Sequence, residues 1–294
     1  MNQARIDYSP IVDRKPFFLP EGARVAVWVI PNIEHFHFDA PGTAITSSTA
    51  HFTPDVLNYS WRDYGPRVGV WRMMDIMHKY GVKGTVTLNS EVCEHYPQIM
   101  EAGMQLEWEW MGHGETNSRM LANLSEDEER TVIRRVRDTI ERVTGKRPKG
   151  WLGPALTETF HTPDILAEEG FEYVGDWVND DQPYPIKVRN NSLYSIPYSI
   201  EMNDITAFLT MHMTPEDFYQ MLVDQFDVLY EDGASTGRVM SICLHPFLIG
   251  HPFRSKSLDK ALKYITGHQD VWVTTGGEII DHYKQQFQTE QANA

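Results

Sequence analysis

The sequence has few cysteines and no long hydrophobic run. Cys93 and Cys243 are the only two cysteines among 294 residues. Two thiols so far apart form no disulfide framework and make no thiolate metal site by themselves. No apolar run reaches the roughly 20 residues that a membrane-crossing helix needs, and residues 1–17 lack the apolar stretch of a secretion signal. We therefore expect a cytoplasmic protein with reduced thiols.

Basic residues are also scarce, and phosphate-binding loops are absent. The chain has 26 Lys and Arg residues against 41 Asp and Glu residues, which gives a formal net charge of −15. A nucleic acid backbone would be repelled by this charge. Neither GxGxxG nor GKS/GKT occurs, so the usual nucleotide-binding loops are missing. We expect a small-molecule substrate, with no nucleic acid or membrane partner.

The sequence does contain short apolar runs that alternate with amphipathic stretches. One helix is marked clearly at both ends, because Ser125 and Glu128 form a capping box and Gly145 follows as a stop signal. Alternating strands and helices predict a single-domain α/β fold, specifically a distorted (β/α) barrel of about seven parallel strands. The expected strands cover residues 24–30, 83–88, 105–110, 149–152, 171–175, 193–197, 238–244 and 271–274.

Two segments lie outside this alternation. Residues 1–23 are expected to form an N-terminal extension of the single domain, which spans residues 1–294. Residues 37–64 form an insertion that is long enough to act as a lid over a site or as an arm that contacts another subunit. An ordinary surface loop remains the alternative for this insertion.

Three ionisable side chains follow directly after expected strands, where the active sites of barrel enzymes lie. Glu34 is a candidate general base, with a pKa raised by burial, or a structural carboxylate that accepts loop N–H groups. His113 stands between two glycines, which let a ligand approach the backbone; alternatively it is a buried histidine bonded to a carboxylate. His245 is a candidate acid for a leaving nitrogen, or a strand-end histidine that moves no proton.

At these positions the sequence resembles the polysaccharide deacetylase superfamily, and within it the subgroup of metal-independent allantoinases and cyclic imide hydrolases. The resemblance implies a cofactor-free hydrolase that assembles as a homo-tetramer. The stretches that carry it are YGPRVGVWRMMDIMHKY (64–80), GHG (112–114), GW (150–151), EEGFEYVGDWVNDD (168–181), IPYSIEMND (196–204) and MSICLHPFLIG (240–250).

The sequence departs from the metal-binding motifs of typical deacetylases, which hold a divalent ion with Asp, His and His. Glu34 occupies the position of the base, His35 replaces the metal-binding Asp, and Asn117 replaces the second His. Leu152 stands where deacetylases carry an arginine that tunes the base. A remnant metal site of His35, His113 and Asn117 would hold zinc poorly, because a neutral amide is a weak ligand beside imidazole or carboxylate.

A missing Lewis acid would leave several kcal/mol of carbonyl polarisation unsupplied. Cyclic imides and ureides need less polarisation, because their nitrogen leaves more easily than that of an acetamide. We therefore expect a hydrolase that opens a C–N bond in a small cyclic amide, imide or ureide. Candidate side chains for holding the flat ring follow expected strands: Asp176, Asn203, Asp204 and Trp110.

Two other functions stay open on the sequence alone. The first is a metal-dependent N-deacetylase of an N-acetylated amino sugar, with a zinc site rebuilt from His35, His113 and either Glu34 or Glu115. The second is a non-catalytic module that binds a small molecule on a scaffold that has lost its activity.

Overall fold

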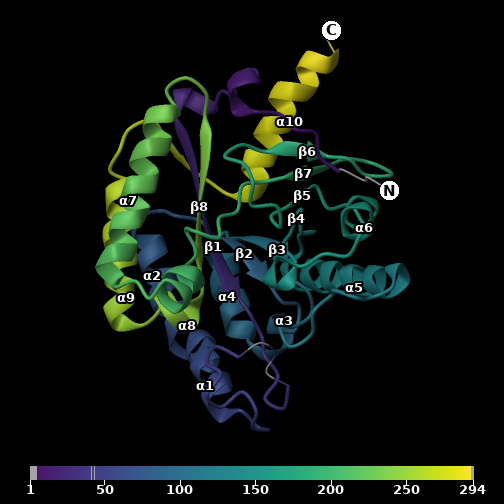
Figure 1. The fold of residues 1–294 in the computed structure, drawn as a ribbon, viewed down its shortest axis with the longest axis vertical. Coiled ribbons are helices and arrows are strands. Elements are labelled where there is room, and N and C mark those ends of the chain that lie inside the picture. The colour runs from purple at the N-terminus through teal and green to yellow at the C-terminus, as the bar shows by residue number, and fades with distance from the viewer. Residues whose placement is uncertain (1–4, 41, 43, 293–294) are drawn as a thin grey trace.

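A curled, mostly parallel sheet forms the centre of the protein in the computed structural model, which describes residues 5–40, 42 and 44–292 (Figure 1). Its strand order is β6-β7-β5-β4-β3-β2-β1-β8, and β9 also pairs with β1. The predicted distorted barrel of parallel strands is confirmed. The strands are β1 (Val25–Ile33), β2 (Thr85–Leu88), β3 (Glu109–Gly112), β4 (Gly150–Trp151), β5 (Tyr173–Val174), β6 (Tyr184–Ile186), β7 (Leu193–Ser195), β8 (Arg238–Leu244) and β9 (Val271–Val273).

β6 is a strand that the sequence did not predict, and it makes the antiparallel pairing with β7. It is three residues long and contains Pro185, which has no N–H to donate and is tolerated at a sheet edge. β6 and β8 end the strand order, so the barrel is incomplete between them. Two backbone bonds partly bridge this seam, from Val239 to Asp181 and from Cys243 to Met202, each 2.9 Å long.

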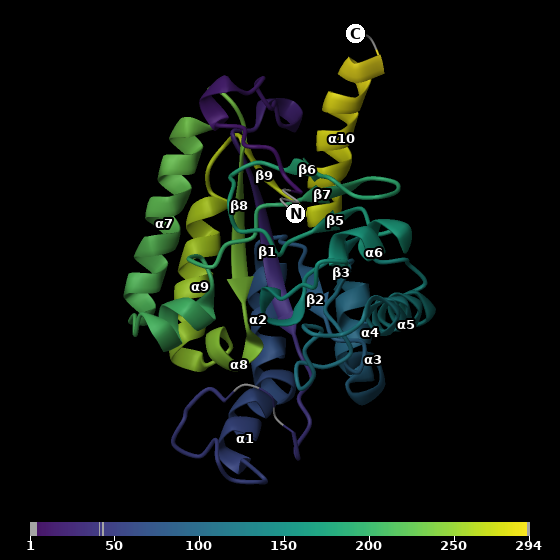
Figure 2. The same cartoon turned by 45° about the vertical axis from the view of Figure 1, so that its right-hand side comes forward.

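Helices cover the outside of the sheet. α7 and α9 pack together on one flank and α5 and α6 on the other, while α1 lies at the end of the molecule toward which β1 runs (Figure 2). Among the described residues, no helix combines the length and hydropathy needed to cross a bilayer. The helices are α1 (Val56–Tyr64), α2 (Val70–Lys79), α3 (Val92–His95), α4 (Pro97–Gln105), α5 (Glu126–Thr144), α6 (Thr162–Glu168), α7 (Pro215–Asp232), α8 (Pro246–Ile249), α9 (Pro252–Ile265) and α10 (Gly276–Ala292).

Helix boundaries follow the expected end signals with one exception. The capping box of Ser125 with Glu128 starts α5, and Gly145 ends it in a left-handed conformation. The exception is the segment of residues 92–105, which is divided into α3 and α4 at Tyr96. Pro97 explains this break, because proline lacks an N–H and disfavours helical geometry in the residue before it.

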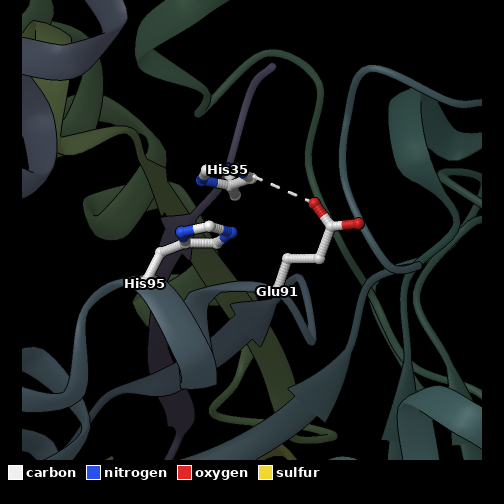
Figure 3. A group of neighbouring side chains, drawn as sticks. All are labelled: His35, Glu91 and His95. Carbon is white, nitrogen blue, oxygen red and sulfur yellow. Dashed lines mark ion pairs between the residues drawn. The ribbon is translucent and has the colours of Figure 1, made fainter. Parts of the chain in front are cut away.

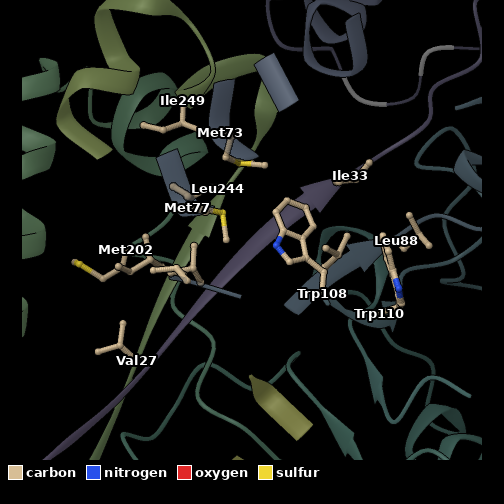
Figure 4. Packing of buried hydrophobic residues seen from close by; sticks show 14 of the residues in the cluster. Val27, Ile33, Met73, Met77, Leu88, Trp108, Trp110, Met202, Leu244 and Ile249 are labelled. Carbon is tan, nitrogen blue, oxygen red and sulfur yellow. The ribbon is translucent and has the colours of Figure 1, made fainter. Parts of the chain in front are cut away.

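Strand side chains alternate between two layers of the core. Val27 and Ile33 of β1 pack in the outer layer between sheet and helices, with Met73 and Met77 of α2 (Figure 4). Trp28, the residue after Val27, belongs to a second cluster inside the barrel. This alternation determines which side chains after each strand reach the barrel mouth.

Candidate active site

The three ionisable residues that the sequence singled out meet at the barrel mouth. Glu34 continues the inward-facing positions of β1, and its side chain is only 10% exposed. Its Oε1 atom lies 3.5 Å from His113 Nε2 and 3.7 Å from His245 Nε2. The same oxygen accepts a hydrogen bond from Asn117 Nδ2 at 2.7 Å. Side chains from the ends of β1, β3 and β8 therefore converge on one carboxylate oxygen.

The charges around Glu34 reverse the pKa shift that burial alone would give. Burial raises the pKa of Glu34, but a hydrogen bond from His113 and the positive charges of His245, His113 and Arg62 lower it more. The net pKa is below its ordinary value, so the expectation of a raised pKa was wrong. Glu34 is therefore ionised at neutral pH and ready to accept a proton.

His245 is held by a fully buried carboxylate. Asp204 Oδ1 lies 2.7 Å from His245 Nδ1, and Asp204 Oδ2 accepts the backbone N–H groups of His245 and Ile249 at 2.8 and 3.2 Å. Burial lowers the pKa of His245, but the charge of Asp204 and its hydrogen bond raise it more, and Glu34 adds to this. The net shift is upward, which favours the cationic ring, whose Nε2 proton is directed toward Glu34.

Asp204 and Asn203 were expected to hold a flat substrate ring, but the structure buries both side chains. Asp204 is inaccessible to solvent, and all its hydrogen bonds are directed to the residues that follow β8. Asn203 is also buried; its amide nitrogen lies 3.3 Å from the Tyr198 hydroxyl and its oxygen accepts the Ile205 N–H. Both side chains therefore stabilise the buried residues beneath the barrel mouth.

The orientation of His113 is fixed by a backbone carbonyl. Its Nδ1 donates to the Leu152 oxygen at 2.7 Å, so Nε2 can also donate to Glu34 only when the ring is cationic. Packing and backbone geometry also require the two flanking glycines. A Cβ on Gly112 would come within 2.7 Å of the Trp151 ring, and Gly114 has a φ of +68°.

Asp176 accepts a hydrogen bond from the peptide group whose carbonyl oxygen contacts His113. Its Oδ1 accepts the Gly153 N–H at 2.7 Å, so the Leu152–Gly153 peptide links Asp176 to His113. Burial first, and then the charge of Glu158, raise the pKa of Asp176 well above its ordinary value. The raised pKa favours the neutral, protonated form of Asp176.

This arrangement predicts different results for two substitutions of Asp176. Asp176→Asn should retain activity within about threefold, because asparagine keeps a neutral oxygen acceptor for Gly153. Asp176→Ala should lower kcat/KM by about 3- to 10-fold, the loss of one hydrogen bond that orients His113. Steady-state kinetics of both variants measure this difference. A larger loss in the asparagine variant than in alanine would show that Asp176 needs its charge.

Trp110, predicted to line a flat pocket, lies in the outer layer of the core. It is 4% exposed and packs against Gly103 of α4, where an added Cβ would come within 2.5 Å of the indole ring (Figure 4). Alternation along β3 explains this placement, since Met111 faces the barrel interior and Trp110 faces the helices. Trp110 therefore does not reach the barrel mouth.

The residues at the former metal positions do not fit a shared ion. Asn89 Nδ2 donates to Asn117 Oδ1 at 2.9 Å, so the nitrogen of the Asn117 amide faces Glu34. By alternation along the chain, the His35 side chain points to the side opposite Glu34. Its ring stacks on that of His95, with the two centroids 4.2 Å apart (Figure 3). Burial, and then the charge of His95, lower the pKa of His35 to about 4. An amide nitrogen and an outward imidazole cannot complete a site with His113.

Two residues near Glu34 were not singled out from the sequence. Asn89 follows β2 directly, so the rule that identified Glu34 and His113 would also have found it. Arg62 belongs to α1 in the insertion 37–64, where the sequence gave no signal. Its guanidinium lies 4.1 Å from the centre of the Phe36 ring, and its positive charge acts on both Glu34 and His245.

A cavity of about 1090 Å³ lies away from this mouth, along the seam between β6 and β8. The N-terminal extension covers part of it, anchored by an ion pair of 2.6 Å between Arg14 and Asp180. Glu34, His113 and His245 do not line this cavity. The concentration of ionisable groups, and not the volume of the cavity, marks the candidate site.

Comparison with known proteins finds similar sequences among the polysaccharide deacetylases. Residues 57–174 match the sequence model of the polysaccharide deacetylase family. A Schizosaccharomyces pombe protein assigned to the polysaccharide deacetylases is 28% identical over 239 residues, which cover 74% of this chain and 73% of the relative. The peptidoglycan deacetylase of Helicobacter pylori is 24% identical over 75% of this chain and 85% of its own.

Solved structures extend the similarity to nearly the whole chain. The crystal structure of the allantoinase PuuE superimposes with a TM-score of 0.82 and 26% sequence identity, covering 95% of this chain and 98% of that one. A Pseudomonas aeruginosa structure described as a polysaccharide deacetylase gives the same TM-score at 27% identity, covering 91% and 93%. In sequence and in fold the chain is therefore similar to the polysaccharide deacetylases and to an allantoinase of the same fold.

Proposed function

We propose that this protein hydrolyses a C–N bond in a small cyclic amide, imide or ureide. One observation carries the proposal: an ionised Glu34 lies beside two histidines, whereas His35 and Asn117, at the former metal positions, point elsewhere or present a nitrogen. Such a site supplies proton transfer and hydrogen bonds. The similarity to an allantoinase structure supports the same substrate class.

The proposed reaction begins with water between Glu34 and the substrate carbonyl. Glu34 removes a proton from this water while the oxygen attacks the carbonyl carbon. The carbonyl oxygen becomes an oxyanion, for which His113 Nε2 is the candidate hydrogen-bond donor. As the C–N bond breaks, His245 Nε2 donates its proton to the departing nitrogen, and the ring opens to an acid and an amide or urea.

The geometry also accounts for the return of the site to its starting state. After ring opening, Glu34 holds a proton and His245 has lost one. Their reacting atoms are 3.7 Å apart, so one small rearrangement or a single bridging water returns the proton. The buried carboxylate of Asp204 favours this return, because it stabilises the cationic imidazole.

The substrate class follows from the strength of this chemistry. A general base and acid contribute about 10² to 10⁴-fold each, without the additional polarisation that a metal gives to an amide carbonyl. An imide or ureide nitrogen departs as a stabilised anion, so it needs less polarisation. Acid–base catalysis by Glu34, His113 and His245 is therefore expected to be sufficient to open such rings.

A substrate screen tests this proposal. Purified protein would be incubated with succinimide-type imides, hydantoins, allantoin and dihydropyrimidines, and ring opening followed by ultraviolet absorbance with and without EDTA. We expect turnover of at least one compound that persists with the chelator. Activity confined to substrates outside these ring classes would contradict the proposal.

Deacetylation of an amino sugar is the second candidate, favoured by the family match and by the names of the sequence relatives. The same screen separates it when N-acetylglucosamine oligomers are included and acetate release is measured. Acetate release that stops with EDTA would support the deacetylase. Binding of a ring compound without turnover would instead support a non-catalytic module.

A further inference from the structure

A second cluster of ligand-type side chains lies on the outer side of β1. The ligand atoms of His35, Glu91 and His95 all lie within 4.8 Å of one another, and no other group of three His, Cys, Asp or Glu residues in the described part of the chain does so (Figure 3). Glu91 Oε2 is 3.7 Å from His35 Nε2. The His35 and His95 rings are stacked, with centroids 4.2 Å apart and planes 4° from parallel.

Strand alternation and the pairing of β1 with β2 bring these three residues together. Alternation along β1 turns His35 outward, away from Glu34, toward the segment that follows the neighbouring strand β2. That segment carries Glu91, and His95 is the last residue of α3. The cluster therefore joins the carboxyl ends of two parallel strands.

Surrounding groups hold the carboxylate in place. Arg119 donates to Glu91 Oε1 at 2.8 Å, and His37 Nε2 lies 2.7 Å from Glu91 Oε2. The hydroxyl of Tyr96 lies 3.3 Å from His35 Nδ1, which leaves Nε2 of that ring directed toward the carboxylate. Oriented ligands with partners of their own are typical of protein metal sites.

We propose that His35, Glu91 and His95 bind a zinc ion or a transition ion of similar preference. Two imidazoles and one carboxylate form a common zinc ligand set, and they disfavour magnesium and calcium. Tetrahedral zinc places its ligand atoms roughly 3.3 Å apart, close to the separation of 3.7 Å between His35 and Glu91. His37 or a water molecule completes the fourth position.

Binding requires one local change. The lone pairs of parallel rings do not converge, so the exposed ring of His95 must turn out of the stack to face the ion. The site goes beyond the proposed reaction, which uses no ion. An ion there would tie the end of β1 to α3, directly behind the peptide that carries Glu34.

Metal titration of the whole protein tests this site without reference to activity. Protein stripped with EDTA would be titrated with Zn²⁺ by calorimetry and with Co²⁺ by visible absorption, which reports tetrahedral coordination. We expect one ion per chain, and at least about 10-fold weaker binding in His95→Ala and Glu91→Gln. His78→Ala, an exposed histidine of α2, serves as the matched control and should bind as the wild type does.

A third variant distinguishes this cluster from the site around Glu34. His113→Ala should keep the affinity, because His113 faces the barrel interior and lies outside the cluster. Loss of binding in His113→Ala but not in His95→Ala would place the ion at Glu34 and overturn the inference. A wild-type protein that binds neither ion would overturn it as well.

Discussion

Replacing Glu34 with glutamine should lower kcat/KM for ring opening by about 10²- to 10⁴-fold, the usual contribution of a general base. Glutamine keeps the size of the side chain and an oxygen that accepts from Asn117, so the fold should persist. The amide cannot remove a proton from water. Steady-state kinetics with the substrate found in the screen would measure the loss, and thermal unfolding would verify the fold.

Glu115→Gln is the matched control for this experiment. Glu115 lies in the loop after β3, and its carboxylate pairs with Arg135 at 2.6 Å. Its substitution should leave kcat/KM within about twofold of the wild-type value, because a surface ion pair contributes little. Near-normal activity in Glu34→Gln would remove Glu34 from the mechanism, and the proposed reaction with it.

Replacing Asp204 with asparagine should move the alkaline limb of the pH–rate profile to lower pH. Asp204 raises the pKa of His245, so the wild-type enzyme keeps its acid form to a pH above the ordinary histidine value of about 6.5. Without this charge the cation is lost at lower pH. Profiles of kcat/KM against pH for both proteins would measure the shift, and an unchanged limb would exclude His245 as the group that titrates.

The same substitution has a consequence for stability. A folded-state pKa above the unfolded value stabilises the protein below the unfolded pKa, and this increment disappears as pH rises through the folded pKa. The difference in unfolding free energy between wild type and Asp204→Asn should therefore be larger at about pH 6 than at about pH 9. Urea unfolding at both pH values measures it, and a difference that grows with pH would contradict the assignment.

His245 itself gives an independent check of the leaving-group step. His245→Ala should slow compounds with poor leaving nitrogens more than compounds with good ones, because a stabilised anion departs without a proton. A series of substituted imides that differ in the acidity of the N–H would measure this trend. Equal slowing across the series would mean that His245 does not donate the proton.

The long regular elements could be predicted from the sequence because their signals are local. β1 and β8 are continuous apolar runs, and α5 carries both a capping box and a glycine stop. β6 and α1 could not be predicted in the same way. β6 is three residues long and contains a proline, and the residues that α1 buries are polar, namely Asn58 and Arg62.

The sequence predicted only those features of the site that depend on which residues follow a strand. That rule identified Glu34, His113 and His245, which the structure brings together around one oxygen. Position after a strand does not determine where a side chain points. His35 follows β1 as Glu34 does, but alternation along the chain turns its side chain outward. Asn117 presents its nitrogen only because a second amide, Asn89, holds its oxygen. Such dependence on a partner far along the chain leaves no pattern in a single sequence.

Electrostatic environment was the least predictable property. Burial alone suggested a raised pKa for Glu34, and the structure reverses this direction through groups from three separate elements. Arg62, His113 and His245 are distant in sequence, so their combined effect appears only after folding. Asp204 was expected to contact a substrate, but burial makes it a partner of His245.

Turnover by metal-free protein tests the central claim most directly. Wild-type protein and His95→Ala would be stripped of metal, checked by elemental analysis, and assayed for ring opening before and after addition of zinc. The proton-transfer site around Glu34 predicts that both proteins work without metal and that zinc leaves their rates within about twofold. Inactive metal-free protein whose turnover returns with zinc, in the wild type and in His95→Ala alike, would contradict the claim.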